Sequence, residues 1–396
     1  MDESLTPCSV QEAETILQDK IEEKQSVAVV GKNQRGLSIP DGMTTVSSQK
    51  LKNLIFFNKE DLVIGVQAGM EAGELQQILQ EQGLRLHVNP TRKETTVGSM
   101  IACNDAGPTK MFMGGLRDYV IGIEYINGLG VNVRGGGKVV KNVAGYDLMK
   151  LMLGSRGGYG MITQVNFKVM PVPLAPKRYF KEYSNLQWQP AVEKLAQTRT
   201  PVSSLQVTYS DGKYTVCIGY DGSSGKIGRI ENDLRQLFGE GEILEFDSID
   251  KAQYTSVSDE NYGYQEPFKK MWGCGSDHFH AVVFTKFSST LESDVIEGFA
   301  QIDKNIKLLL FPFSGVIEVI APYSEETDIT RLSTAIKKTL PQIKRYSLLS
   351  PTSPKQIQCL LSQSDDEKLA LRLKQSLDPN NLFHSPYFES LKKVFN

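Results

Sequence analysis

The sequence predicts an α+β protein of two domains, and three observations support this prediction. The chain has 396 residues, and at roughly 150 residues per domain this length suggests two or three domains. Apolar residues repeat with the helical period in some segments and alternate as in strands in others. Of the 34 glycines, 22 lie between Gly31 and Gly160. We therefore expect a glycine-rich first domain over residues 1–175 and a second domain over residues 176–396.

The first domain is predicted to mix helices and strands. A polar helix with one apolar stripe is expected at 9–25, because Ala13, Ile16 and Leu17 share a face. The apolar run at 27–30 predicts a short buried strand that ends at Gly31. The remaining predicted strands lie at 54–57, 62–66, 120–126 and 161–169, and the remaining helices at 71–82 and 146–153.

The second domain is predicted from a change of pattern after a proline cluster. Pro171, Pro173 and Pro176 follow the last strand of the first domain, where the glycine density also falls. Beyond them, the Ser-Asp-Gly-Lys turn at 210–213 predicts a hairpin. The predicted strands lie at 205–209, 214–220, 278–284, 306–311, 315–320 and 345–349, and the helices at 227–238, 291–302, 329–340 and 365–376. Hairpins mixed with helices predict an antiparallel sheet with helices on one face.

The composition excludes several classes of protein. A formal net charge of −2 disfavours a nucleic-acid binder that relies on bulk positive charge. No run approaches the roughly 18 apolar residues of a spanning helix, and the first residues lack the pattern of a secretory signal. Five widely spaced cysteines indicate reduced thiols rather than a disulfide framework. We expect a cytoplasmic protein without a transmembrane segment, which partner proteins can hold at the inner membrane.

Common catalytic signatures are absent from the sequence. There is no G-x-G-x-x-G, no Walker A, no H-E-x-x-H and no G-x-S-x-G motif. His278 and His280 could place two imidazoles on one face of a strand, but no third His or Cys lies near them in sequence. We therefore expect no metal site and take both as ordinary strand histidines.

Three glycine-rich segments are suited to a cofactor with phosphate groups. The loop at 30–36 directly follows a strand, so its N–H groups can turn toward an anion, and Lys32 and Arg35 add positive charge. Residues 95–102 place hydroxyls at a predicted helix start, where phosphates bind readily. The glycines of 154–160 let the backbone approach a flat ligand closely.

The order of these segments resembles a known family. The carrying residues are 96–102 (TVGSMIA), 107–108 (GP), 116–122 (LRDYVIG), 135–148 (GGGKVVKNVAGYDL) and the tail 376–383 (SLDPNNLF). They are similar to the FAD-binding domain of the vanillyl-alcohol oxidase/p-cresol methylhydroxylase (PCMH) type. The similarity is closer to the E-subunit family, the FAD-binding subunits of bacterial glycolate oxidases.

The resemblance implies a PCMH-type two-lobed FAD-binding domain, followed by a second α+β domain with an antiparallel sheet and a C-terminal tail that returns to the FAD domain. Some family members attach FAD through a His in the first loop. Gln34 and Arg35 stand there instead, so we expect non-covalent FAD. The residues expected to bind it are Gly31, Lys32, Asn33, Gln34, Arg35, Gly36, Thr96, Val97, Gly98, Ser99, Asn104, Gly107, Lys141, Gly160 and Ile162.

The expected function is that of an FAD-binding subunit in a glycolate-oxidase-like complex that oxidises a small 2-hydroxy acid. Its expected partners are a catalytic flavoprotein subunit and an iron–sulfur subunit, which receives the electrons. The chain lacks the H-x-G-D-G-N-x-H segment of hydroxyacid-oxidising relatives. No catalytic base is assigned, because Arg117, Lys141, Tyr146 and His278 are each better explained as structural.

Two alternatives remain open at the level of sequence. The first is a non-catalytic scaffold subunit with weak or lost FAD binding, which the departure of Lys32, Asn33 and Gln34 from the small residues of family loops favours. The second is an independent FAD-dependent oxidoreductase with an unknown small substrate.

Overall fold

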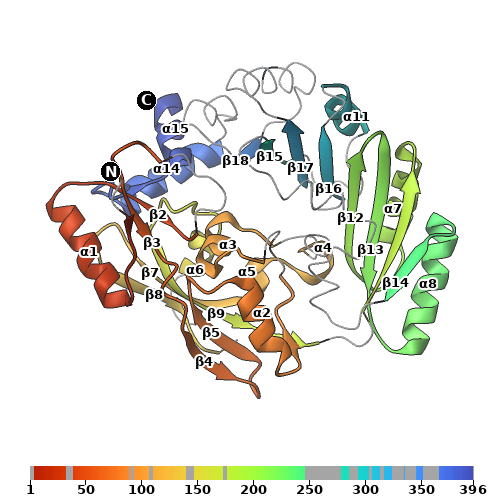
Figure 1. Ribbon diagram of the computed structural model, residues 1–396, viewed down its shortest axis with the longest axis horizontal. Helices are drawn as coiled ribbons and strands as arrows, with labels where there is room; N and C mark the ends of the chain where they lie inside the picture. The colour runs from red at the N-terminus through yellow and green to blue at the C-terminus, as the bar shows by residue number, and fades with distance from the viewer. Residues whose placement is uncertain are drawn as a thin grey trace.

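The described residues form three larger sheets and a two-stranded ribbon, with their covering helices (Figure 1). The structure is a computed structural model. It describes residues 4–32, 39–88, 90, 93–106, 110–139, 147–172, 176–245, 278–284, 293–302, 306–312, 316–322, 334, 345–350 and 365–395. Among these residues, no helix is long and apolar enough to cross a membrane.

The first sheet is parallel and joins the two ends of the chain. Its order is β1 (Ser4–Leu5), β3 (Thr44–Ser47), β2 (Val27–Val30) and β19 (Phe383–His384). Helix α1 (Val10–Glu22) packs Ala13 and Leu17 into the same core cluster as Val27 of β2. The helix begins at Ser9, whose side chain accepts a hydrogen bond from the Glu12 N–H group.

The second sheet has five antiparallel strands. Its order is β4 (Leu54–Asn58), β5 (Val63–Gln67), β9 (Met161–Lys168), β7 (Val120–Ile126) and β8 (Asn132–Gly136). One core cluster joins this sheet to α2 (Ala72–Gln80), α3 (Val97–Cys103), α5 (Leu116–Tyr119) and α6 (Leu148–Met152). Beside the sheet, β6 (Leu84–Arg85) and β10 (Met170–Pro171) form a short antiparallel ribbon.

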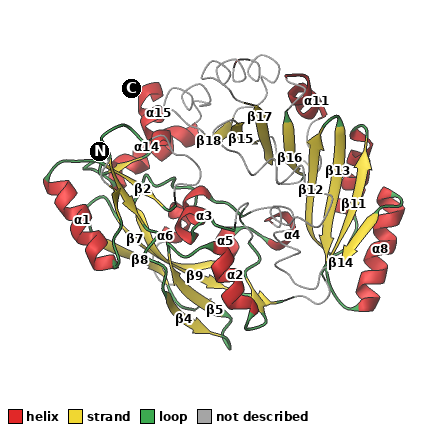
Figure 2. Cartoon of the chain, viewed as in Figure 1, coloured by secondary structure: helices red, strands yellow, loops and turns green. Residues whose placement is uncertain are grey.

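The third sheet is antiparallel throughout its eight strands. Its order is β14 (Glu242–Glu245), β11 (Lys177–Tyr183), β13 (Lys213–Tyr220), β12 (Val202–Ser210), β16 (Lys307–Phe311), β17 (Val316–Pro322), β15 (His278–Phe284) and β18 (Arg345–Ser350). The helices α7 (Gln189–Gln197), α8 (Ser224–Phe238) and α11 (Ser293–Ile302) share its core cluster. Figure 2 shows α7 and α8 on the face of this sheet that points away from the other two sheets. The predicted α+β class with an antiparallel sheet is confirmed.

The C-terminal segment packs against the first and second sheets rather than the third. After β18 the described chain continues with α14 (Asp365–Leu377), β19 and α15 (Pro386–Phe395). Leu371 of α14 and Phe388 of α15 lie in the core cluster of the five-stranded sheet, while Phe383 of β19 lies in that of the parallel sheet. The two chain ends accordingly lie near one another in Figure 1.

A buried ion pair fixes the turn between α14 and β19. Lys374, which is 1% exposed, pairs with Asp378 and also donates to the Phe383 carbonyl at 2.7 Å. The Asp378 carboxylate accepts from the N–H groups of Leu382 and Phe383, both at 2.8 Å. Gly128 lies against this turn, since a Cβ there would come within 2.4 Å of the Asp378 Cα. The DPNNLF segment is therefore a structural turn in which Asp378, Leu382 and Phe383 are buried.

The elements predicted from periodicity are found with shifts of a few residues. Strand β7 covers the predicted 120–126, and α8 begins at Ser224 rather than 227. The helix predicted at 329–340 lies outside the described residues, apart from residue 334. The structure adds strands that were not predicted, among them β3, β11 and β19.

Candidate functional site

The glycine-rich segments predicted from the sequence converge around the end of β2. An added Cβ at Gly31 would lie 2.4 Å from the Thr96 Oγ1, so the loop after β2 touches the start of α3. The loop after α6 lies against both α3 and β2. The Gly154 N–H donates to the Ile101 carbonyl of α3 at 3.0 Å. A Cβ at Gly157 would be 3.7 Å from the Val29 carbonyl oxygen of β2. Segments about 125 residues apart in sequence thus form one site.

The first turn of α3 is held tightly to the end of β5. The Thr96 side chain caps the helix by accepting from the Ser99 N–H at 3.3 Å. The Val97 N–H donates to the Met70 carbonyl at 2.8 Å, and the Gly98 N–H to the Ala68 carbonyl at 2.7 Å. These amides already have partners, so the expected contribution of Val97 and Gly98 to phosphate binding would be to position the hydroxyls of Thr96 and Ser99.

The charge of Lys32 is shared with a carboxylate. Its Nζ pairs with Glu71, and the two side chains are 35% and 32% exposed. Glu71 also forms an isolated antiparallel bridge with Thr96. The carbonyl oxygen of Gly31 accepts from the Ser47 Oγ at 2.8 Å. Two contacts therefore hold the start of the predicted phosphate loop: Ser47 of β3 binds the Gly31 carbonyl, and Glu71, which precedes α2, binds the Lys32 side chain.

The other described candidates have clear structural roles. Asn104 ends α3 in the left-handed conformation, with φ of 52°. Gly160 precedes β9 where a Cβ would lie 2.6 Å from the Ile126 carbonyl oxygen. Ile162 pairs with Tyr125 across β9 and β7, and its side chain is buried in the core cluster. Contacts of these residues with a cofactor remain predictions.

Several predicted residues lie outside the described part of the chain. These are Asn33, Gln34, Arg35, Gly36, Gly107 and Lys141, together with Tyr146 among the considered bases. Of the two strand histidines, the backbone alone is described: both belong to β15, paired with β17. No group of three or more metal-ligating side chains occurs among the residues that could be searched.

Ser155 is a candidate that the sequence analysis did not single out. Its side chain is 2% exposed, and its Oγ has no hydrogen-bond partner among the described residues. It lies between Gly154 and Arg156, whose N–H groups donate to α3 carbonyls. A buried hydroxyl without a partner costs free energy, so it suits a polar atom of a ligand. Its position within a Gly-Ser-Arg-Gly-Gly run was the available sequence signal.

The geometry fits a phosphate-bearing cofactor. Gly31 leaves room where a side chain would collide, and Ser155 offers an unpartnered hydroxyl close to α3. The residues that would hold the cofactor are Gly31, Thr96, Ser99 and Ser155.

A second polar cluster lies at the junction between the first part of the chain and the eight-stranded sheet. Arg85 of β6 is 7% exposed, and its Nη2 lies 3.8 Å from the Oδ2 of Asp221, which follows β13. Burial lowers the pKa of Arg85 to about 10. His87 is 4% exposed, with its ring centroid 5.7 Å from that of Tyr119. Burial, followed by the charge of Arg85, lowers the pKa of His87 to about 4. His87 is therefore neutral near pH 7.

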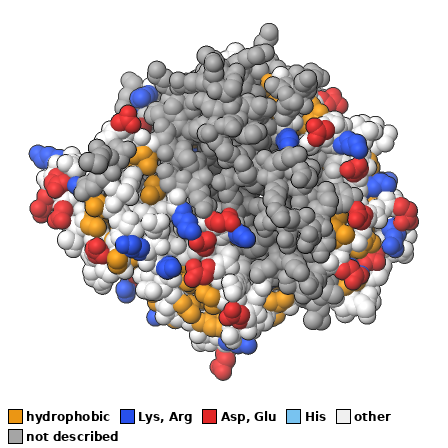
Figure 3. All heavy atoms as spheres, viewed as in Figure 1, with side chains coloured by type: hydrophobic (Ala, Val, Ile, Leu, Met, Phe, Trp, Pro, Cys, Tyr) orange, Lys and Arg blue, Asp and Glu red, His pale blue; other side chains and the backbone are white. Residues whose placement is uncertain are grey.

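Charged side chains are mixed on the visible surface. On the face shown in Figure 3, the basic and acidic side chains of the described residues alternate rather than forming a patch of one sign.

Comparison with known proteins identifies the first part of the chain. Residues 4–136 match the family described as "FAD binding domain". The chain is 32% identical over 229 residues to the glycolate oxidase subunit GlcE of Escherichia coli, a match that spans 56% of this chain and 62% of that protein. It is 34% identical over 146 residues to a D-lactate dehydrogenase of Anaerostipes hadrus, and 32% identical over 158 residues to the glycolate oxidase subunit GlcD of Bacillus subtilis.

These matches are partial in length. They span 31% of the A. hadrus protein and 34% of the B. subtilis protein, so the chain covers less than two thirds of each of the three relatives. The fold extends further than the sequence similarity. A solved structure of alkyldihydroxyacetonephosphate synthase superposes with a TM-score of 0.70 at 15% identity, over 96% of this chain and 76% of that one.

The family match covers β1, β2 and β3 of the parallel sheet, α3, and all strands of the five-stranded sheet except β9, so it includes the contact between Gly31 and Thr96. The cofactor class predicted from the sequence is therefore confirmed as FAD. Residues 4–136, about a third of the chain, match the FAD binding domain family.

Proposed function

We propose that this chain is the FAD-binding subunit of a glycolate-oxidase-like complex that oxidises a small 2-hydroxy acid. The observation that carries the proposal is the similarity to the glycolate oxidase subunit GlcE over 229 residues, which extends beyond the length of the FAD-binding domain. Relatives named GlcD, D-lactate dehydrogenase and D-2-hydroxyglutarate dehydrogenase support the same substrate class.

In this proposal FAD, when bound, supplies the two-electron acceptor for a 2-hydroxy acid. The chain's own residues hold and orient it. Gly31 permits close approach of the backbone, and the hydroxyls of Thr96, Ser99 and Ser155 provide polar contacts. We propose that the second domain covers the reacting end of the cofactor. We place the boundary between the two domains near residue 175, where β10 gives way to β11.

The proposal includes transfer of electrons out of this chain. A catalytic flavoprotein subunit and an iron–sulfur subunit are the proposed partners. The similarity of the chain to both a GlcE and a GlcD subunit supports a complex of related subunits.

A scaffold subunit with weak FAD binding is the second candidate. The Lys32–Glu71 ion pair favours it, because a lysine that already has a carboxylate partner contributes less positive charge to a phosphate. The amides of Val97 and Gly98, which donate to protein carbonyls, favour it as well.

Purification of the chain alone separates these two candidates. The proposed function predicts a yellow protein that releases FAD on denaturation. A colourless protein that takes up no added FAD would favour the scaffold. Isolation of the tagged chain from its native cells should then recover a larger flavoprotein and an iron–sulfur protein. The recovered complex should reduce an artificial electron acceptor with glycolate or D-lactate, and failure with every 2-hydroxy acid tested would contradict the proposed reaction.

A further inference from the structure

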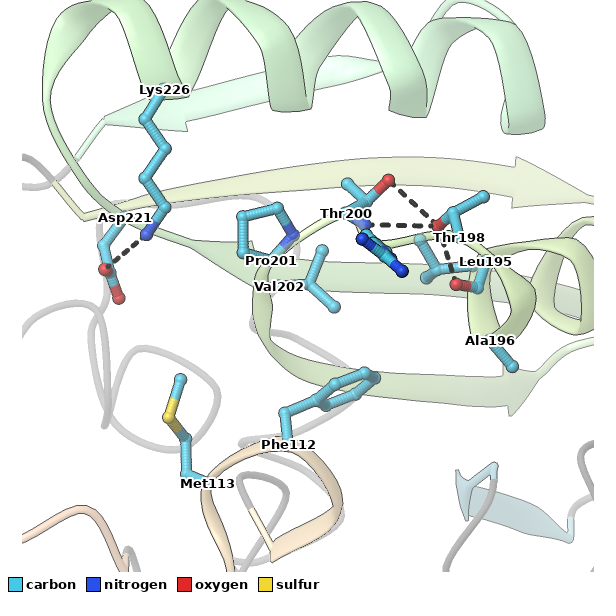
Figure 4. A pocket seen from close by; sticks show the side chains of 11 residues that line it. Phe112, Met113, Leu195, Ala196, Thr198, Thr200, Pro201, Val202, Asp221 and Lys226 are labelled. Atoms are coloured by element: carbon cyan, nitrogen blue, oxygen red, sulfur yellow. Dashed lines mark hydrogen bonds and ion pairs between the residues drawn. The ribbon is translucent and has the colours of Figure 1, made fainter.

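A pocket of about 490 Å³ lies where the FAD-binding domain meets the eight-stranded sheet (Figure 4). One side consists of Phe112 and Met113 of α4 (Lys110–Met113), and the other of the turn between α7 and β12. Phe112 packs against the core cluster of the eight-stranded sheet. The volume falls within the range of sites for small molecules.

The pocket contains more positive than negative charge. Its carboxylate, Asp221, has two basic neighbours, with the Lys226 Nζ 3.9 Å from Oδ1 and the Arg85 Nη2 3.8 Å from Oδ2. Figure 4 shows Lys226 extending from α8 toward Asp221. Arg199 lines the same pocket and forms no hydrogen bond or ion pair within the described part of the chain. The described lining of the pocket therefore holds two basic side chains, Arg199 and Lys226, and one carboxylate, Asp221.

Arg85, which lies behind Asp221, is buried and only weakly paired. It is 7% exposed, its Nε has no hydrogen-bond partner among the described residues, and its ion pair with Asp221 is long. The buried Lys374 is different, because it contacts both the Asp378 carboxylate and a backbone carbonyl. A buried cation is costly unless it is paired and hydrogen-bonded. A second carboxylate near Asp221 would reduce that cost.

We infer that this pocket binds a small carboxylate anion, held by Arg199 and Lys226, with Arg85 behind Asp221 supplying additional positive charge. Thr198 and Thr200 lie on the same wall, but their hydroxyls already have partners: Thr198 Oγ1 donates to the Leu195 carbonyl at 2.8 Å and Thr200 Oγ1 to Asp233 at 2.9 Å. Basic groups opposite the apolar side chains of Phe112 and Met113 suit a short carboxylic acid.

Titration calorimetry of the FAD-loaded chain tests the inference with glycolate and with oxalate, against sodium chloride at equal ionic strength. We expect saturable binding of both carboxylates. R199Q and K226Q should each weaken it about tenfold, because each removes a charged partner worth somewhat more than 1 kcal/mol. Both side chains are exposed, so the variants should fold normally. K213Q is the matched control, since Lys213 pairs with Glu182 at the opposite end of β13.

A variant that neutralises the carboxylate should change the carboxylate affinity in the opposite direction. D221N removes the competing carboxylate, so carboxylate binding should become several-fold tighter. Absence of carboxylate binding, or unchanged affinity in both R199Q and K226Q, would overturn the inference. A loss of carboxylate affinity in D221N as large as the loss in R199Q would contradict the argument that the pocket has excess positive charge.

The flavin absorption spectrum distinguishes a substrate carboxylate, bound beside the flavin, from a carboxylate that binds at a separate site. A spectral change on binding identifies it as the carboxylate site of the proposed 2-hydroxy acid substrate, and this identification rests on the proposed function. Heat of binding without a spectral change identifies a separate site for a carboxylate that does not react. Failure of the proposed function would appear as absence of substrate oxidation, with calorimetric binding retained.

Discussion

Gly31 lies at the contact between two segments of the cofactor site. A Cβ added there would come within 2.4 Å of the Thr96 Oγ1, the same atom that caps α3. The position therefore links the loop after β2 to the first turn of the helix. The polar residues beside it, Ser47 and Glu71, fix the backbone of Gly31 and the side chain of Lys32.

We predict that G31A weakens FAD retention several-fold and lowers stability by about 1 kcal/mol, the usual cost of a lost N-cap. The added methyl group would displace the Thr96 hydroxyl from the Ser99 N–H. The ratio of flavin to protein absorbance after gel filtration measures the first effect, and urea denaturation the second. G225A is the control, because a Cβ at Gly225 in α8 has nothing within 4 Å. Full FAD retention in G31A would contradict the assigned contact.

His87 makes stability depend on pH. Its pKa is lowered to about 4 in the folded chain, against an ordinary value of 6.5. The unfolded chain therefore binds a proton below pH 6.5 that the folded chain does not accept until about pH 4. The stability from this group is complete above pH 6.5 and is lost as the pH falls toward 4.

We predict that H87Q reduces this loss. Between pH 7 and pH 5 the His87 contribution to the free energy of unfolding should fall by about 2 kcal/mol. Urea denaturation of both proteins at the two pH values measures it. Equal pH dependence in H87Q and the parent chain would show that His87 does not titrate in this way.

Among the elements, the turn between α14 and β19 combines a buried ion pair with three hydrogen bonds to backbone groups. Lys374, Asp378 and the backbone of Leu382 and Phe383 satisfy one another in a buried setting. Burial lowers the pKa of Lys374, and the Asp378 carboxylate opposes that shift. Through this turn β19 is placed beside β2, the strand that leads into the predicted phosphate loop.

We predict that D378A destabilises the chain by about 3–5 kcal/mol, the usual cost of leaving a buried charge unpaired. K374M should lower the free energy of unfolding by less than D378A, because the Asp378 carboxylate keeps its two backbone N–H donors. Chemical denaturation measures the order of the two variants, and K393A at an exposed lysine of α15 is the control. A K374M effect larger than that of D378A would contradict this account of the turn.

Periodicity identified elements whose faces differ strongly in polarity. The alternation of Ile162, Val165 and Phe167 predicted β9, because one face of that strand lies in a core cluster. Strand β11 was missed since its four charged residues surround the buried Tyr179 and Phe180. Strand β19 has two residues, and it is a strand because of its pairing with β2. Local sequence contains no information about such distant pairing.

The candidate site was predictable to a similar degree. The order of the glycine-rich segments, through its resemblance to a known family, indicated that residues 31–36, 96–99 and 154–160 lie at one cofactor site. The ion pair between Lys32 and Glu71 was not predictable, since it depends on where α2 begins relative to β2. The pocket near Asp221 depends on contacts between the two halves of the chain and escaped prediction for the same reason.

The whole molecule has separate hydrophobic cores. The eight-stranded sheet has its own core cluster, while the first two sheets and the C-terminal helices form the others. A ligand held by the FAD-binding domain should therefore stabilise the two parts unequally.

We predict that removing FAD lowers the stability of the FAD-binding domain and leaves the eight-stranded sheet nearly unchanged. At a free FAD concentration about 100 times the dissociation constant, the stabilisation is about 2.7 kcal/mol. Hydrogen exchange with and without FAD measures it segment by segment. Protection should fall in β2, α3 and β19 and persist in β12 and β13. An equal loss of hydrogen-exchange protection in the two parts would show that they unfold as one unit.

The pairing of β19 with β2 also sets the order of events during synthesis. The strand at residues 27–30 leaves the ribosome well before its neighbour at residues 383–384. At ordinary elongation rates the delay is on the order of tens of seconds. During that time the nascent parallel sheet has an unpaired edge that invites wrong partners. We therefore expect FAD to be retained only after residues 383–384 have been synthesised, so a ribosome stalled before residue 383 should carry an N-terminal domain that does not retain the flavin.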